Sequence, residues 1–315
     1  MEKTYIETSG SGLIYESEKE LYNFLLRNKD TLEFPGLKIS QEIPSHFPYV
    51  VTYRNGNDGI ICSDNSIDIS YPIDELTEAS IVFMGYILME KQRAEKSMVT
   101  IHSACIEKDN NGILLLGRAG SGKTTLSIDL CQKHGFSLIG NDRNVIGYNN
   151  QDKILAFDGT KFLFLRYESI KRNLPHLLHL FPEKDMDSWL RKVKIMPEEI
   201  GISCSQKIPI RKSYIVHIDN NLRDLCIRNG DTPENRLYLN ELFSMYIRGI
   251  YTTFCDNQFH AQGYIPSYDS KELYLKRIKL INDIFEKTNL EYISGCVEDV
   301  SEYVNEKQKK LVYTK

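Results

Sequence analysis

The sequence lacks the long apolar runs that mark membrane and secreted proteins. Its longest apolar run, Ile81 to Met89, has nine residues, whereas a membrane-spanning helix needs about 20. The first ten residues, MEKTYIETSG, contain no apolar core region, so we do not expect a signal peptide. Internal repeats and low-complexity tracts are also absent. These absences predict a cytoplasmic protein with no membrane partner.

A basic surplus and metal-binding cysteine pairs are lacking as well. The formal net charge is −4 over 315 residues, so nucleic acid is not expected as a partner. Seven cysteines lie far apart, and no CxxC pair or Cys/His cluster has zinc-site spacing. We therefore expect reduced thiols, as in a cytosolic protein.

What the sequence does contain is a phosphate-binding pattern. Residues 117–126 read GRAGSGKTTL, in which Gly117, Gly122, Lys123 and Thr124 match G-x-x-x-x-G-K-[ST]. An apolar run precedes the pattern, and a helical pattern that closes at a glycine follows it. A buried strand that leads through a glycine loop into a helix is the context that phosphate binding requires.

The chemistry of the loop follows from its residue types. Glycines let backbone N–H groups converge on one point, and the N-terminus of the following helix adds about half a positive charge there. Lys123 is expected to reach the β- and γ-phosphates, and the Thr124 hydroxyl is expected to ligate Mg²⁺. The predicted nucleotide-binding residues are Gly117, Gly120, Ser121, Gly122, Lys123, Thr124 and Thr125.

The segment before the loop predicts a hairpin. Two apolar runs flank KDNNG, which is typical of a tight turn between antiparallel strands. If the turn is tight, Glu107 lies opposite Gly112, and His102 falls opposite Gly117. His102 is therefore expected beside the phosphates.

Two acids compete for the second metal-binding position. Asp142 ends FSLIGND, close behind the loop helix, and Asp219 ends the apolar run YIVHID. No N-K-x-D motif is present, which argues against a GTPase. An antiparallel hairpin before the loop favours Asp142, because motor ATPases and Ras-like proteins have parallel neighbours at this point.

Together these segments resemble the HPr kinase/phosphorylase family, which is structurally related to phosphoenolpyruvate carboxykinase. The resemblance rests on IHSACIEKDNNGILLLGRAGSGKTTL, on SLIGNDR and on YIRGI at residues 246–250. It covers roughly residues 98 to 290. The first 95 residues look like the N-terminal region of stand-alone HPr-kinase-like proteins, some of which are kinases in natural-product or peptide-modifying pathways.

The resemblance implies roles for individual residues. His102 matches the family's histidine near the phosphates, Arg248 matches the arginine of its IRG segment, and Asp142 matches the second of two adjacent acids. The first of those acids is Asn141 here, and the glutamate before IRG is Tyr246. An amide cannot take a proton from an attacking hydroxyl, so these departures argue against protein serine phosphorylation and phosphorolysis by the family's mechanism.

We therefore expect an α/β protein with a P-loop module of the HPr kinase/PEP carboxykinase type behind an N-terminal α+β lobe. The predicted domains are residues 1–96, the ATP-binding domain 97–300 and a solvated tail 301–315. The basic segments RYESIKR (166–172) and RKVK (191–194) are expected to be solvated helix faces rather than an anion site.

The expected function is ATP·Mg²⁺-dependent phosphoryl transfer to a small molecule or peptide. His102, Asp142 and Arg248 are the expected catalytic residues, and Thr124 and Asp142 are the expected metal ligands. The alternatives are a nucleotide-binding regulatory protein with little turnover and an enzyme of ATP-dependent adenylation or ligation. A homo-oligomer is a further expectation from the family, which is often oligomeric.

Overall fold

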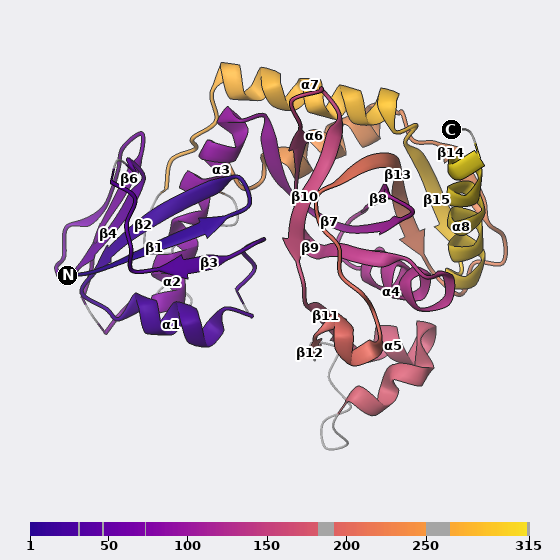
Figure 1. The fold of residues 1–315 in the computed structure, drawn as a ribbon, viewed down its shortest axis with the longest axis horizontal. Helices are drawn as coiled ribbons and strands as arrows, with labels where there is room; N and C mark the ends of the chain where they lie inside the picture. The colour runs from indigo at the N-terminus through magenta and orange to yellow at the C-terminus, as the bar shows by residue number, and fades with distance from the viewer. Residues whose placement is uncertain (31, 46, 73, 182–191, 250–264, 314–315) are drawn as a thin grey trace. The chain divides into compact units, whose positions relative to one another are not determined.

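The computed structural model describes residues 1–30, 32–45, 47–72, 74–181, 192–249 and 265–313. They form a mixed α/β protein with several sheets, as the sequence predicts (Figure 1). The chain divides into two compact units: unit 1 comprises Met1–Thr100 and Tyr238–Lys279, and unit 2 comprises Ile101–Leu237 and Leu280–Lys315. Within the described ranges, no helix is long and apolar enough to cross a membrane.

Unit 1 is built on a six-stranded sheet with the order β3-β1-β2-β4-β6-β5. Helices pack against this sheet around a core of residues such as Leu13, Tyr53 and Ile87. The strands are β1 (Glu2–Thr8), β2 (Ser11–Ser17), β3 (Lys38–Ser40), β4 (Val50–Arg54), β5 (Gly59–Cys62) and β6 (Ser66–Ser70). The helices are α1 (Leu21–Asn28), α2 (Glu78–Met84) and α3 (Tyr86–Glu95), with parts of α6 (Pro233–Ser244) and α7 (Lys271–Lys287).

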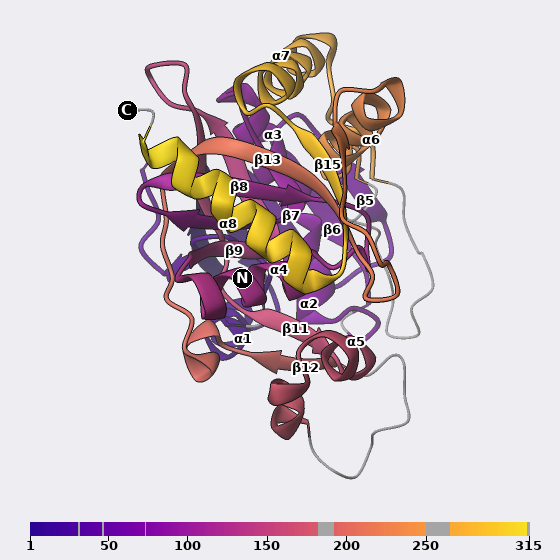
Figure 2. The ribbon, with the colours of Figure 1, turned by 90° about the vertical axis from the view of Figure 1, so that its right-hand side faces the viewer.

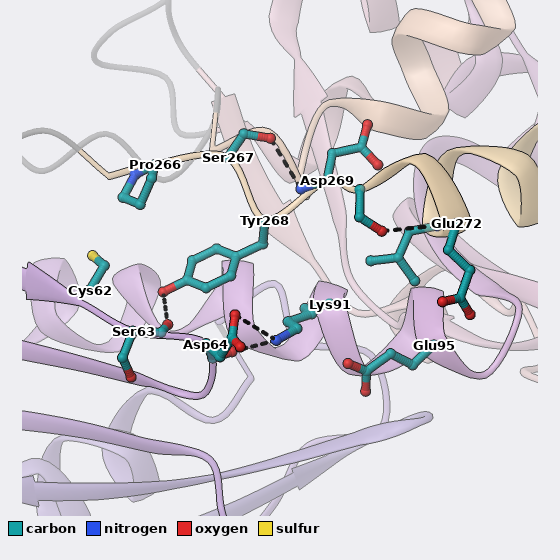
Figure 3. Close-up of a pocket in the computed structure, with 12 residues that line it drawn as sticks. Cys62, Ser63, Asp64, Lys91, Glu95, Pro266, Ser267, Tyr268, Asp269 and Glu272 are labelled. Carbon is teal, nitrogen blue, oxygen red and sulfur yellow. Dashed lines mark hydrogen bonds and ion pairs between the residues drawn. The ribbon is translucent and has the colours of Figure 1, made fainter.

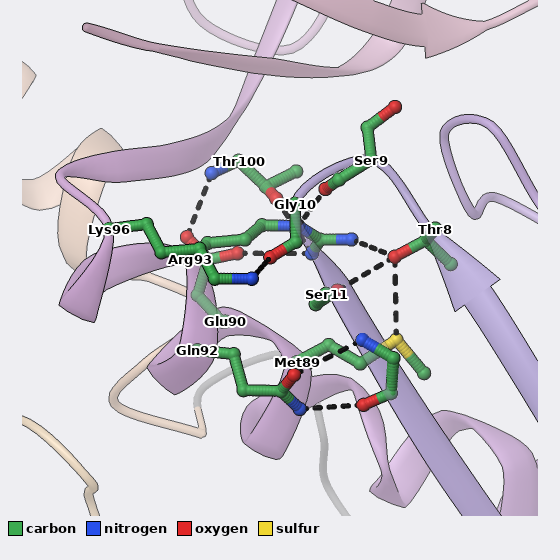
Figure 4. Close-up of polar contacts among 11 residues, drawn as sticks. Thr8, Ser9, Gly10, Ser11, Met89, Glu90, Gln92, Arg93, Lys96 and Thr100 are labelled. Atoms are coloured by element: carbon green, nitrogen blue, oxygen red, sulfur yellow. Dashed lines mark hydrogen bonds and ion pairs between the residues drawn. The ribbon is translucent and has the colours of Figure 1, made fainter. Parts of the chain in front are cut away.

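A buried arginine holds the first hairpin of unit 1 to α3 (Figure 4). Arg93 is fully buried and donates to the Ser9 carbonyl at 2.9 Å, to the Thr8 hydroxyl at 2.6 Å and to the Thr100 hydroxyl at 3.1 Å. Its ion-pair partner Glu90, at 3.3 Å, also accepts from the Thr100 backbone N–H. The guanidinium is thus paired on all sides, as burial of a charge requires.

Unit 2 contains a seven-stranded sheet with the order β10-β9-β7-β8-β13-β15-β14. Its antiparallel and parallel pairs are mixed: β8 runs antiparallel to β7 and parallel to β13. The strands are β7 (Met98–Lys108), β8 (Asn111–Leu116), β9 (Ser137–Tyr148), β10 (Ile154–Thr160), β13 (Ile208–Ile218), β14 (Cys226–Asn229) and β15 (Glu291–Gly295).

Helices α4 (Lys123–His134) and α8 (Val297–Tyr313) lie side by side on one face of this sheet (Figure 2). Next to α4 lies a smaller group: the two-stranded sheet β11 (Leu163–Arg166) and β12 (Lys192–Ile195), with α5 (Tyr167–Asn173) and the 3₁₀ helix η1 (Pro175–Leu180). The 3₁₀ helix η3 (Pro197–Ile200) follows β12.

The hairpin prediction is confirmed. The register pairs Glu107 with Gly112 and continues to Ala104 opposite Leu115. Asp109 and Asn110 turn the chain with positive φ angles of 55° and 60°, a conformation that Asp and Asn tolerate better than most residues.

Three sequence predictions are wrong in their details. Residues 238–279 belong to unit 1, so the expected domain 97–300 is not one compact unit. The expected solvated tail is helix α8, because Val300 and Val304 lie on one face of the helix and pack into the core of unit 2. The expected solvated helix face at residues 191–194 is also wrong, because Lys192 begins strand β12.

Candidate functional site

The glycine loop between β8 and α4 has no room for side chains at two of its positions. Gly117 has a φ angle of 146°, and a Cβ there would lie 2.4 Å from the Ser121 Oγ and 2.8 Å from the Val216 carbonyl. Gly122 has a φ angle of 90°, and a Cβ there would lie 2.4 Å from Ile218. Because the backbone bends this way and packs closely on β13, both positions require glycine.

The middle of the loop is open. A Cβ on Gly120, whose φ angle is 80°, would meet no atom within 4 Å. The loop continues directly into the first turn of α4, whose N–H groups have no partner within the helix. The loop therefore offers backbone donors and free space at the positive end of a helix, which is where an anion binds.

Lys123 lies across this loop. Its ammonium donates to the carbonyls of Gly117 at 2.8 Å and Arg118 at 3.1 Å, and the residue is buried. Burial lowers the pKa of Lys123 to about 8, against an opposing effect of the nearby Asp142 carboxylate. A cation is thus held at the loop at neutral pH, and Asp142 lies within its electrostatic reach.

Thr124 contacts the segment that the sequence places after the loop helix. Its hydroxyl donates to the Asn141 side-chain oxygen at 2.9 Å. The Thr160 hydroxyl donates to the Asn141 carbonyl. The Asn141 side-chain nitrogen is buried and has no hydrogen-bond partner in the part of the chain that is described. Such a buried donor costs free energy unless a further acceptor binds it.

A bulge in β9 carries Asp142 to the loop. The β9–β10 register pairs Asn141 with Thr160 and Asn144 with Gly159, so Asp142 and Arg143 have no residue opposite them. Asp142 adopts a left-handed conformation with φ 62°. Bulges of this kind redirect side chains next to functional sites, and here the redirected pair includes the predicted metal ligand.

His102 lies on β7, two residues before the last recorded pair of the hairpin, Ala104 opposite Leu115, so its position opposite Gly117 stays a prediction. The side chain is half-buried, and three cations act on it electrostatically. Burial first, and then repulsion by these cations, lowers the pKa of His102 to about 4. The imidazole is therefore neutral at pH 7 and keeps a basic nitrogen. The cations are Lys123, Arg143 and Lys192.

The remaining loop residues have structural contacts. The Thr125 hydroxyl lies 3.2 Å from the Ser169 hydroxyl and so joins the first turn of α4 to α5. Ser121 accepts at its carbonyl from the Ile218 N–H at 2.9 Å. Its buried hydroxyl has no partner in the ranges that the structure describes.

Arg248 belongs to unit 1, whereas the other predicted site residues belong to unit 2. It forms an ion pair at 3.7 Å with Asp269, to which Arg277 also donates two hydrogen bonds. Tyr246, at the position of the family's glutamate, is buried against the Tyr86 ring in the core of unit 1. A phosphate contact by Arg248 therefore stays a prediction.

Asp219 remains the alternative acid. It follows Ile218, which hydrogen-bonds the loop, but its carboxylate accepts from the Asn221 backbone N–H at 2.9 Å and side chain at 2.8 Å. Asp219 thus stabilises a turn. No cluster of three or more His, Cys, Asp or Glu side chains with metal-binding geometry occurs in the described residues, so a magnesium ion here would need ligands beyond carboxylates.

A separate pocket of about 540 Å³ lies within unit 1 (Figure 3). Tyr268 forms one wall and donates to the Ser63 carbonyl at 2.7 Å, while Lys91 donates to the Asp64 carbonyl at 2.6 Å. Glu272 pairs with Lys276 at 2.9 Å. The charged residues that line this pocket are one lysine, Lys91, and four carboxylates, Asp64, Glu95, Asp269 and Glu272, so the lining has no cationic surplus for an anion such as a phosphate.

Comparisons with known proteins find matches among solved structures. No family model matches the sequence, and no curated protein matches it. Among 75 matching chains of solved structures is the HPr(Ser) kinase/phosphatase from Coxiella burnetii, with 18% sequence identity and a TM-score of 0.26. The match covers 43% of this chain and 67% of that chain. At this identity and TM-score, the match carries no argument about the fold or the activity of this chain.

Sequence reasoning missed two residues near the loop. Lys192 lowers the pKa of His102 electrostatically. Arg166 lies opposite Lys192 in the antiparallel register of β11 and β12. A search for short alternating strands around residues 163–166 and 192–195 could have found this sheet. The basic residues of both segments instead predict solvated helix faces from the sequence alone.

Proposed function

We propose that this chain is a kinase that transfers the γ-phosphoryl group of Mg²⁺·ATP to a small molecule or peptide. The observation that carries the proposal is the loop from Gly117 to Thr124. Its glycines are required by close packing, its centre is open, and Lys123 and the start of α4 supply positive charge. This combination suits a triphosphate better than any neutral ligand.

Binding of the phosphates is assigned to the loop and to Lys123. The ammonium now satisfied by two loop carbonyls would turn to the β- and γ-phosphates. An anion next to this buried cation strengthens its charged form, so the phosphates offset the cost of burial that lowers the pKa of Lys123.

The residues near Thr124 fit a magnesium ion. Thr124 supplies a hydroxyl and Asp142 a carboxylate, both hard oxygen ligands, and Mg²⁺ is commonly held by one or two protein groups together with phosphates and water. When bound, the metal neutralises charge on the phosphates. Asn141 holds the Thr124 hydroxyl in place through its side-chain oxygen.

The proton of the acceptor hydroxyl is assigned to His102. In the transfer, the acceptor oxygen forms a bond to the γ-phosphorus, the bond from phosphorus to the β–γ bridging oxygen breaks, and ADP leaves. His102 is neutral because of burial and nearby cations, so it has a free lone pair for the proton. Bound phosphates would oppose those cations and make the ring more basic.

A second candidate is a nucleotide-binding regulatory protein with little turnover, which the amide at Asn141 favours. ATP-dependent adenylation or ligation is the third. Incubation with Mg²⁺·ATP and a metabolite and peptide mixture separates them by product. The kinase predicts ADP together with a phosphorylated acceptor. AMP would indicate adenylation, and binding without either product would indicate the regulatory protein.

A further inference from the structure

The small sheet of β11 and β12 places two cations directly opposite each other. Arg166 pairs with Lys192 in the antiparallel register, so their side chains leave the same face of the sheet. Both are exposed, and neither forms an ion pair with a carboxylate in the described parts of the chain. Like charges in this arrangement repel, and an anion between them would remove that repulsion.

This cation pair lies beside the loop helix. Arg166 immediately precedes α5, and Ser169 of α5 contacts Thr125 in the first turn of α4 at 3.2 Å. Figure 2 shows β11, β12 and α5 together next to α4. The contact between these two hydroxyl groups holds the start of α5, and with it Arg166, close to the first turn of α4.

The effect of Lys192 on the pKa of His102 is a second observation that relates this sheet to the glycine loop. Lys192 acts on His102 together with Lys123 and Arg143. The carboxylate of Asp142 opposes the charge of Lys123. The neighbouring residue, Asn141, is an amide and adds no negative charge. Lys123 and Asp142 are taken up by the proposed phosphates and metal, so Lys192 and Arg166 form positive charge beyond the nucleotide.

We propose that Arg166 and Lys192 bind an anionic group of the acceptor, so that the substrates of this kinase are hydroxyl compounds carrying a phosphate or carboxylate group. The inference rests on the proposed function, because the acceptor hydroxyl must reach the γ-phosphate held by the loop. A guanidinium and an ammonium side by side suit such a group, since charge-assisted hydrogen bonds to both are short and strong. Lys192 then sets specificity without taking part in bond making.

Lys194 provides a matched control. It lies on the same strand and the same face as Lys192, and its ammonium lies 5.1 Å from the centre of the Phe162 ring, much as that of Lys192 lies 5.8 Å from the Phe164 ring. It sits two residues, roughly 7 Å, further along the strand. Lys192→Gln and Lys194→Gln therefore remove the same charge from the same sheet, and of the two residues it is Lys192 that lowers the pKa of His102.

The test measures acceptor binding with the nucleotide site filled. Protein saturated with a non-hydrolysable Mg²⁺·ATP analogue is titrated with glycerol 3-phosphate and with glycerol, which share hydroxyls and differ in the anionic group. Wild type should bind glycerol 3-phosphate and not glycerol. Lys192→Gln should weaken that binding about tenfold or more, the loss expected for a charged hydrogen bond, while Lys192→Arg and Lys194→Gln should retain it.

Two results would overturn the inference while the kinase proposal stands: no preference of wild type for glycerol 3-phosphate, or equal losses in Lys192→Gln and Lys194→Gln. Failure of the ATP analogue itself to bind would contradict the proposed function, and the acceptor subsite would fall with it. Analogue binding measured for each variant also shows that the variant is folded.

Discussion

Two polar regions of this protein differ in how completely they are paired. Around Arg93 in unit 1, the guanidinium meets a carboxylate, two hydroxyls and a carbonyl, and the Glu90 carboxylate accepts from a backbone N–H as well. Around the glycine loop of unit 2, the buried Asn141 nitrogen has no partner among the described residues. Nearby, two cations face each other across β11 and β12.

The difference in pairing distinguishes a polar network that stabilises the fold from a region that is suited to bind a ligand. A buried charge whose partners all come from the chain stabilises one arrangement of strands and helices. A buried donor left without a partner costs free energy that a ligand can recover, and two exposed cations that face each other repel until an anion lies between them. The Arg93 network is therefore interpreted as a support of unit 1, and the loop region as a place where an anionic ligand completes the pairing.

The largest effect is expected at His102. His102→Ala should lower turnover by about 10²- to 10⁴-fold, the range of a general base, with little change in ATP affinity. Because burial and nearby cations lower the pKa of His102 to about 4, the ring is neutral above that value. Wild-type turnover should therefore be insensitive to this group near pH 7 and should fall as acid protonates it.

His179→Ala is the control for this prediction. His179 is exposed on η1, and its loss should leave turnover unchanged. Steady-state ADP release measures both variants. Strong wild-type turnover that does not respond to His102→Ala would exclude His102 as the base.

The next largest effect is expected in the hydrogen-bond network around Arg93 in unit 1. Glu90→Gln keeps the shape of the side chain but leaves Arg93 buried without its carboxylate, which should reduce the free energy of unfolding by about 3–5 kcal/mol. Glu7→Gln removes one partner of the exposed ion pair with Lys38, at 3.5 Å, and should cost at most about 1 kcal/mol. Urea unfolding compares the two. Equal losses would mean that burial does not distinguish these pairs.

The metal prediction separates the two candidate acids. Asp142→Asn should weaken the magnesium dependence of nucleotide binding by about tenfold or more, because even partners outside the metal's own ligands usually matter by that factor. Asp219→Asn should leave it unchanged, since that carboxylate stabilises a turn. Magnesium titrations at fixed ATP give the answer, and the reverse pattern would place the ligand at Asp219.

The smallest effect is expected at Asn141. If His102 is the base, Asn141→Asp adds a carboxylate that the reaction does not need. The change in turnover should then be smaller than the roughly 10²- to 10⁴-fold effect of a general base. A regulatory protein that has lost its catalytic acid predicts the opposite, a clear rise from a near-zero rate. ADP release by the two forms separates these accounts.

The sequence predicts the loop and hairpin well because both are local. The order of glycines from Gly117 to Gly122 and the turn residues Asp109 and Asn110 specify backbone conformations within a few residues. The register of the hairpin then follows by counting, and it gives Glu107 opposite Gly112. Continued beyond the recorded pairs, the same count predicts His102 opposite Gly117 without any information from distant parts of the chain.

Features that depend on distant partners could not be predicted in the same way. The bulge at Asp142 and Arg143 is defined by the pairing of β9 with β10, which skips these two residues. Because β10 comes later in the sequence, the residues of β9 alone do not reveal the bulge. The assignment of Arg248 to unit 1 depends on packing of Tyr246 against Tyr86, far away in the sequence. The packing of helix α8 on the core is hard to predict from the sequence, because its lysines and glutamates outnumber the few valines that face the core.

The most direct test of the central claim is the effect of Mg²⁺·ATP on thermal unfolding of wild type and Lys123→Ala. Ligand at 100 times its dissociation constant stabilises a folded protein by about 2.7 kcal/mol, so wild type should show a clear rise in Tm. Lys123→Ala should lose most of that rise, because the ammonium that lies across the loop is gone. Equal rises in both proteins would contradict the account, because nucleotide would then bind elsewhere than in the loop.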